Sequence, residues 1–261
     1  MIESITILSG INKQGKKETV ERIDMKMGDV ISIVGPTGSG KTTLINDIEL
    51  FANANTPTGR RVLINGDVPP EEYKNDPSKN PIALITQHTS FLSDLPVYEF
   101  LVNHIKIRWN EKGQIEGLIK QTIDFANQLT GEPVLLNNRM TELSGGQTRA
   151  LLIADATIVC NTPIVLLDEV ENAGINRTRA LELLRAYRKI FIFVTHDPRI
   201  ALLSDYRIVM SSGSMEKMIV TSPKEKELTK HLTRLDSALS EIRDRIRRGE
   251  KVEEDLLEGI I

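Results

Sequence analysis

The chain has 261 residues, of which 40% are hydrophobic, and a formal net charge of −3 at pH 7. This length allows one sizeable α/β domain with an appendage, and the interspersed charges give no footprint of nonspecific nucleic-acid binding. No apolar run approaches the roughly 20 residues that span a bilayer, and the N-terminus lacks a signal-peptide pattern, so we expect no membrane span.

Short β-like stretches separated by turns occupy residues 1–33, and residues 61–67 form another predicted strand and turn. Between them, residues 35–42 read Gly-Pro-Thr-Gly-Ser-Gly-Lys-Thr and fit the phosphate-loop pattern G-x-x-x-x-G-K-[ST]. A strand is predicted over residues 30–34 before this loop, and a helix from Thr43 after it, so the helix N-terminus would face the phosphates. This context argues against the alternative of a chance glycine-rich turn.

Each part of the phosphate loop has a physical role. Glycines let backbone N–H groups turn inward around phosphate oxygens. Lys41 should reach the β- and γ-phosphates, and the Thr42 hydroxyl should ligate Mg²⁺. The expected nucleotide contacts are Gly35, Pro36, Thr37, Gly38, Ser39, Gly40, Lys41, Thr42 and Thr43.

An acidic pair, Asp168 and Glu169, follows the aliphatic run at residues 164–167, which predicts a central parallel strand buried on both faces. Open α/β sheets bind ligands at the carboxyl ends of their strands. We expect Asp168 to hold the Mg²⁺ shell and Glu169 to polarise the attacking water. The alternative is an acidic pair that complements a helix dipole.

Two further polar residues, Gln87 and His196, follow predicted strands at residues 81–86 and 190–195. Three strands would therefore deliver polar groups to one edge of one sheet, where a glutamine can complete a magnesium shell and a histidine can contact the γ-phosphate. Each residue taken alone could equally be an ordinary turn residue. We predict surface positions for His88, His104 and His231, and a core or helix-end position for the lone cysteine, Cys160.

From residue 88 to 141 the pattern is mainly helical, most strongly at 97–109 and 115–129. Residues 143–147 then read Leu-Ser-Gly-Gly-Gln. A Ser-Gly-Gly turn that opens a helix offers exposed N–H groups and a positive dipole end, which suit a γ-phosphate presented from outside.

With these motifs the chain resembles the ATP-binding cassette (ABC) ATPases over roughly residues 1–221. In that resemblance residues 35–42 are the Walker A loop, Gln87 the Q-loop, 143–147 the signature, 164–169 the Walker B strand and His196 the switch histidine. The resemblance implies an α/β fold: a P-loop NTPase core with a mainly parallel sheet, a small antiparallel β-subdomain and a helical subdomain over about residues 88–150. It also implies an ATPase that uses ATP and Mg²⁺, located in the cytoplasm.

The resemblance further implies a head-to-tail homodimer. ATP would lie between the Walker A loop of one cassette and Ser144, Gly145, Gly146 and Gln147 of the second cassette. The implied catalytic residues are Lys41, Gln87, Glu169 and His196, and the implied magnesium ligands are Thr42, Gln87 and Asp168.

Three departures from the family pattern limit which family properties can be expected of this chain. Ile175 stands where the family has its D-loop aspartate, so cross-dimer polar contacts there would differ. Ala150 and Asp155 occupy places often held by arginine. No aromatic residue precedes Phe51, so adenine recognition should be weak.

The use of the cassette stays open at this point. Residues 91–101 are similar to the segment that receives a membrane partner's helix in transporter subunits, or form an ordinary loop-helix junction with an apolar staple. The chain is expected to be the nucleotide-binding subunit of a transporter with a transmembrane permease partner; alternatively, it is a soluble ATPase that remodels a protein or metalloenzyme partner. A third use, holding ATP with little turnover, is disfavoured by Glu169 and His196.

Residues 222–261 form a separate charged tail in this interpretation. Apolar residues recur at alternating steps of four and three until Gly249, which predicts a helix with a heptad-like seam. The seam consists of Leu228, Leu232, Leu235, Leu239, Ile242 and Ile246. Docking on its own domain and an intermolecular coiled coil are equally compatible with this pattern.

Overall fold

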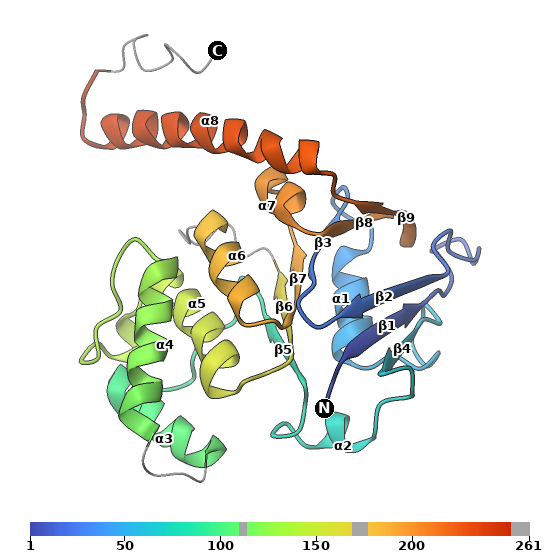
Figure 1. Cartoon of the computed structure of the whole chain (residues 1–261), viewed down its shortest axis with the longest axis horizontal. Helices are drawn as coiled ribbons and strands as arrows, with labels where there is room; N and C mark the ends of the chain where they lie inside the picture. The colour runs from blue at the N-terminus through green and yellow to red at the C-terminus, as the bar shows by residue number, and fades with distance from the viewer. Residues whose placement is uncertain (110–113, 169–176, 252–261) are drawn as a thin grey trace.

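The computed structural model describes residues 1–109, 114–168 and 177–251 (Figure 1). Its centre is a six-stranded sheet in the order β5-β6-β7-β3-β8-β9. Neighbours from β5 to β8 run parallel, and β9 is antiparallel to β8. The strands are β5 (Ile82–Ile85), β6 (Ile164–Asp168), β7 (Ile190–Val194), β3 (Val30–Val34), β8 (Tyr206–Ser211) and β9 (Ser214–Val220). The predicted mainly parallel sheet is confirmed.

A second, antiparallel sheet has the order β2-β1-β4, and it confirms the expected small antiparallel β-subdomain. It consists of β1 (Ser4–Leu8), β2 (Arg22–Lys26) and β4 (Arg61–Ile64). Helix α1 (Lys41–Glu49) lies between the two sheets in Figure 1, and its Leu44, Ile45 and Ile48 are buried in one cluster with residues of both. The short helix α2 (Glu72–Asn75) follows β4.

Strand β7 and residues 164–167 of β6 are wholly apolar, and all of these residues are buried. On β6, Ile164 and Leu166 face the cluster around α1, whereas Val165 and Leu167 face a second cluster formed with the helices. This alternation follows from the strand period of two, and it explains the aliphatic run that the sequence showed at residues 164–167.

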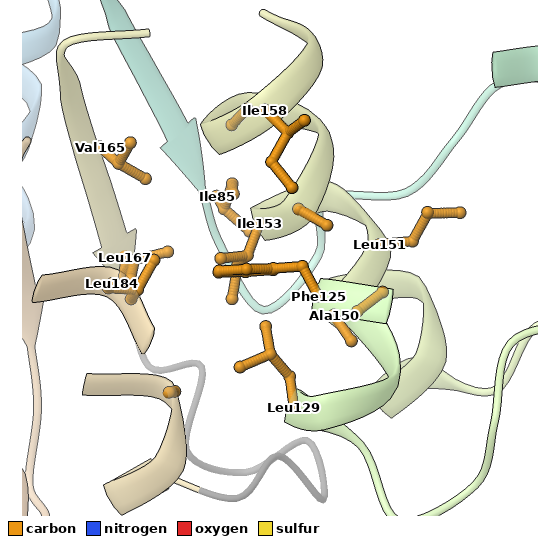
Figure 2. Close-up of a cluster of buried hydrophobic side chains, with 14 of the residues drawn as sticks. Ile85, Phe125, Leu129, Ala150, Leu151, Ile153, Ile158, Val165, Leu167 and Leu184 are labelled. Carbon is orange, nitrogen blue, oxygen red and sulfur yellow. The ribbon is translucent and has the colours of Figure 1, made fainter. Parts of the chain in front are cut away.

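The second cluster joins the sheet to the helical part of the chain. Its helices are α3 (Val97–Arg108), α4 (Ile115–Leu129), α5 (Gly145–Ala154) and α6 (Arg177–Ala186), with a 3₁₀ turn η2 (Met140–Glu142) and a π turn η3 (Asp155–Val159). Figure 2 shows Phe125 and Leu129 of α4 and Ile153 of α5 pointing toward Val165 and Leu167 of β6. The helices predicted near 97–109 and 115–129 are confirmed.

The tail forms one long helix, α8 (Pro223–Arg247), which packs on α7 (Pro198–Leu203). Ser222 caps it in a capping box with Glu225, and Gly249, with a φ of 73°, donates its N–H to Ile246 to end it. The predicted helix and its glycine stop are confirmed. The division of the chain at residue 221 stays a prediction.

Helix α8 docks through polar groups rather than through its apolar seam. Arg199 of α7 pairs with Asp236, Arg207 of β8 pairs with Glu225, and Thr229 is buried. Four of the seam residues are exposed: Leu228, Leu235, Leu239 and Ile246. Within the described residues no helix combines the length and the apolar composition that a membrane span requires.

Candidate nucleotide site

The strand order places the predicted polar residues along one edge of the parallel sheet. Strands β5, β6, β7 and β3 are neighbours and parallel, so their carboxyl ends meet on the same side (Figure 1). Gln87 follows β5, Asp168 ends β6, His196 follows β7, and the phosphate loop follows β3. Glu169 lies outside the described residues.

The phosphate loop packs closely against the turn between β8 and β9, and two of its glycines are required for this approach. A Cβ on Gly35 would lie 2.3 Å from the Met210 carbonyl oxygen, and one on Gly40 would lie 3.0 Å from the Cα of Gly213. Gly40 also has a φ of 99° as the residue that caps α1, a conformation that favours glycine. The loop geometry therefore excludes larger side chains at both positions.

The donors in the loop fit a magnesium-bound phosphate. Lys41 bends back across the loop, and its Nζ donates to the carbonyl oxygens of Gly35 at 2.9 Å and Pro36 at 3.2 Å. Buried hydroxyl groups are normally hydrogen-bonded, yet Ser39 Oγ is buried without a partner among the described residues. A phosphate oxygen would satisfy it, and the exposed Thr42 hydroxyl supplies the oxygen donor that Mg²⁺ prefers.

A cavity of about 250 Å³ opens over the loop. Its lining brings together residues from three separate parts of the chain: Lys13, Thr37, Gly38, Gly40, Lys41, Thr42, Thr43 and His196. His196 therefore lies at the phosphate loop, as the sequence predicted. Gln87 and Asp168 stand at the same sheet edge but outside this lining.

Lys13 is a candidate site residue that the sequence analysis missed. The loop between β1 and β2 folds over the phosphate loop, and Lys13 Nζ donates to the carbonyl oxygen of Gly38 at 2.9 Å. Its position adds a second ammonium group beside Lys41 on the cavity wall. No motif marks Lys13, because the contact spans 25 residues and depends on how the loop folds.

A buried network of ion pairs around Arg60 lies next to the phosphate loop. Arg60 is fully buried and pairs with Glu18 at 2.7 Å and Asp47 of α1 at 2.9 Å. Its guanidinium also donates to the carbonyl oxygen of Gly213, the glycine against which Gly40 packs. Glu18 accepts a further bond from the backbone N–H of Met215 on β9. The network therefore links α1, the loop between β1 and β2, and the turn between β8 and β9. These three segments together support the phosphate loop.

The signature segment forms the predicted turn at the start of a helix. Ser144 caps α5, its Oγ accepts from the Gln147 backbone N–H, and Gln147 Oε1 accepts from the Ser144 N–H. Gln147 also donates through Nε2 to the Pro133 carbonyl, so its side chain is engaged within its own chain. Ser144 and Gly145 are exposed and open to an outside ligand.

Helix α5 and helix α1, which follows the phosphate loop, belong to different hydrophobic clusters. In Figure 1, α5 lies with α3 and α4 on one side of the parallel sheet, and α1 lies on the other. Arg149 of α5 instead contacts the sheet edge, where its guanidinium donates to the carbonyl oxygen of Gln87. Residues 170–176, which include the family departure at Ile175, lie outside the described residues.

Comparison with known proteins identifies the family. The sequence model described as ABC transporter matches residues 21–172. The ABC transporter ATP-binding protein MJ0121 of Methanocaldococcus jannaschii, itself named as uncharacterised, is 45% identical over 251 residues, which cover 96% of this chain and 95% of that protein. The spermidine/putrescine import ATP-binding protein PotA of Bacteroides fragilis is 30% identical over 83% of this chain, which spans 47% of that relative.

Solved structures share the fold. A dimeric ATP-binding cassette, MJ0796, bound to ADP and Pi, superposes with a TM-score of 0.62 at 22% identity over 84% of this chain and 99% of that one. The cbiO1 protein from Clostridium perfringens, part of the ABC transporter complex cbiONQ, gives a TM-score of 0.63 at 22% identity over 89% of this chain and 94% of that one. The family model and the 45% identity to MJ0121 show that the chain belongs to the ABC transporter family and is an ATP-binding cassette ATPase.

Proposed function

We propose that this ATPase works as a homodimer in which each ATP is held between the phosphate loop of one chain and Ser144, Gly145 and Gly146 of the other. The observation that supports the proposal is that α1, which follows the phosphate loop, and α5, which begins at the signature segment, pack on opposite faces of the parallel sheet. In this proposal one chain does not bring both segments to the same nucleotide, and a second chain completes the site. Nucleotide binding and dimerisation are then linked equilibria.

The residues of the site divide the chemistry among them. Mg²⁺, when bound with ATP, would neutralise phosphate charge as the γ-phosphoryl group is transferred to water. Thr42, Asp168 and Gln87 are the proposed residues that hold it, and Lys41 stabilises the charge on the β- and γ-phosphates. Glu169 positions and deprotonates the water, and His196 contacts the γ-phosphate from the cavity wall.

We further propose that the dimer drives a membrane transporter through a permease subunit. Support comes from residues 91–101, where Leu92 is fully exposed and Leu95 and Tyr98 are both 38% exposed. Phe91 packs edge-on against Phe100 with ring centroids 5.0 Å apart, which anchors this apolar surface to α3. The relatives MJ0121 and PotA are both named as transporter ATP-binding proteins, which also supports this proposal. The alternative, a soluble ATPase that remodels a protein or metalloenzyme partner, rests on the departures at residues 170–175 and on the charged tail.

Affinity purification from the native cell tests the transporter proposal. An integral membrane protein should co-purify with the wild-type chain, and Leu92→Asp combined with Tyr98→Asp should reduce its recovery, because two charges would enter an apolar contact. The matched control is Val68→Asp, a change at an exposed apolar residue outside residues 91–101 and outside the α8 seam. Recovery of soluble proteins alone with the wild-type chain would favour the alternative.

Replacing Lys13 by methionine is expected to raise KM for ATP about tenfold with little change in kcat. A charge-assisted bond contributes roughly 1.5–3 kcal/mol when buried, and an exposed lysine should give the lower part of that range. Steady-state kinetics measures the effect. Lys16→Met, an exposed lysine of the same loop outside the cavity lining, is the control and should behave as wild type. An unchanged KM in Lys13→Met would remove Lys13 from the site.

ATP and GTP are expected to be hydrolysed with kcat/KM values within about tenfold of each other, a difference of ~1.4 kcal/mol. Without an aromatic residue before Phe51 the base lacks a stacking partner there, so the phosphate contacts should dominate binding. Parallel kinetics with the two nucleotides tests this. A hundredfold preference for ATP would show that another group recognises adenine.

Replacing Leu235 and Leu239 by aspartate is expected to weaken dimer assembly without lowering the melting temperature. Both side chains are about half exposed in the single chain, at 43% and 50%, so their loss should cost the fold little. In an intermolecular seam the charges would be desolvated. Light scattering and thermal unfolding measure the two effects, with Lys230→Asp and Arg234→Asp as a control outside the seam. A lower melting temperature with unchanged assembly would contradict the intermolecular seam.

A further inference from the structure

A cluster of three potential metal ligands lies in the helical part of the chain, away from the nucleotide cavity. It consists of His104 on α3, Asp155 at the start of the π turn and Cys160 at its end. One ligand atom from each residue lies within 4.8 Å of the other two. The nucleotide chemistry uses none of them. His104, predicted at the surface, is partly buried, with 23% of its side chain exposed.

The π turn creates this cluster. In an α-helix, residues five apart point about 140° away from each other, because each residue advances the helix by about 100°. Here the Cys160 N–H donates to the Asp155 carbonyl oxygen at 2.8 Å, the i→i+5 bond of a π-helix. This wider turn stacks residues five apart on one face. Single π turns often occur at functional sites.

The side chains meet at distances close to those of a metal coordination shell. Cys160 Sγ lies 3.9 Å from His104 Nε2 and 3.5 Å from Asp155 Oδ2. In a tetrahedral zinc site with Zn–S near 2.3 Å and Zn–N or Zn–O near 2.0 Å, donor atoms stand about 3.5 Å apart. Small side-chain adjustments would therefore bring all three donors onto one ion.

The three side chains already contact one another. His104 Nδ1 lies 2.9 Å from Asp155 Oδ1. A metal ion would replace this hydrogen bond, because the Asp155 carboxylate would then be a ligand of the ion rather than the partner of Nδ1. Phe100 packs on the imidazole with ring centroids 5.7 Å apart, and Trp109 Nε1 donates to the Val159 carbonyl of the π turn.

We propose that His104, Asp155 and Cys160 form a binding site for a thiophilic divalent metal, with Zn²⁺ as the natural occupant. Imidazole nitrogen, thiolate sulfur and carboxylate oxygen are the three donor types that Zn²⁺ accepts. Three protein donors leave one position for water. The bound ion would fasten α3 to the turn that follows α5, the helix that begins at the signature segment.

Titration of the full-length, nucleotide-free protein with Co²⁺ tests the site. Cys160 is the only cysteine in the sequence, so a thiolate-to-cobalt charge-transfer band in the near ultraviolet can come from no other residue. The oxygen ligands of the nucleotide site give no such band. We expect the band to saturate at one Co²⁺ per chain, to disappear on addition of Zn²⁺ and to be absent in Cys160→Ser.

The variants His104→Ala and Asp155→Asn should weaken Co²⁺ binding by about tenfold or more. His231→Ala removes an exposed histidine of α8 as the matched control and should leave the affinity unchanged. Thermal unfolding checks that each variant folds, and His104→Gln is the milder replacement if His104→Ala does not. Absence of the band in the wild-type protein, or wild-type affinity in both the His104 and Asp155 variants, would overturn the proposal.

Discussion

Glu169→Gln is expected to lower ATP turnover by about 10² to 10⁴, the usual effect of removing a general base. Glutamine keeps the size of the side chain and a hydrogen-bonding head but lacks the carboxylate that accepts the proton of the attacking water. Nucleotide should still bind, because the phosphate loop, Lys41 and Thr42 are unchanged. ATP should then hold two chains together as a stable dimer, since the step that releases them is blocked.

Steady-state hydrolysis assays and light scattering with ATP measure the two parts of this prediction. Glu227→Gln, which neutralises an exposed carboxylate on α8, is the control and should show wild-type turnover and no trapped dimer. Near-normal hydrolysis by Glu169→Gln at wild-type nucleotide affinity would show that another group activates the water. Loss of activity without a trapped dimer would instead count against a site shared between chains.

Local sequence patterns could predict the sheet edge because its strands are short, apolar and ended by polar residues. The aliphatic runs before Asp168 and His196 mark strands buried on both faces, and the ligand-binding edge follows from the rule for open α/β sheets. The structure confirms that the phosphate loop, Gln87, Asp168 and His196 share one edge.

Contacts between distant segments could not be predicted in this way. Lys13 reaches the phosphate loop across 25 residues, and Arg60 reaches Glu18 across 42, without any motif. The sequence predicted His104 at the surface, but the fold partly buries it between α3 and the π turn η3. The i→i+5 hydrogen bond that forms this turn has no sequence signature. For α8, the heptad pattern predicted a helix but could not show that polar residues would dock it.

Arg60→Met is expected to lower the free energy of unfolding by about 3–5 kcal/mol, the cost of leaving buried charges without their partner. Methionine fills much of the same volume, but Glu18 and Asp47 would each lose their ion pair with Arg60 in a site from which water is excluded. Urea unfolding measures the change. The control is Arg22→Met, whose pair with Asp24 is exposed on both sides and should contribute little to stability.

A triple variant separates two contributions to the lost stability: the cost of burying unpaired charges and the loss of the contacts that Arg60 makes. Adding Glu18→Gln and Asp47→Asn to Arg60→Met removes the unpaired charges, so part of the lost stability should return even though the network is gone. Nucleotide affinity should not recover with it, because the loop support would still be missing: Arg60 also holds the Gly213 carbonyl beneath the phosphate loop. A triple variant less stable than Arg60→Met would mean that hydrogen bonding by Glu18 to the backbone N–H groups of Gly10 and Met215, rather than charge pairing, dominates this network.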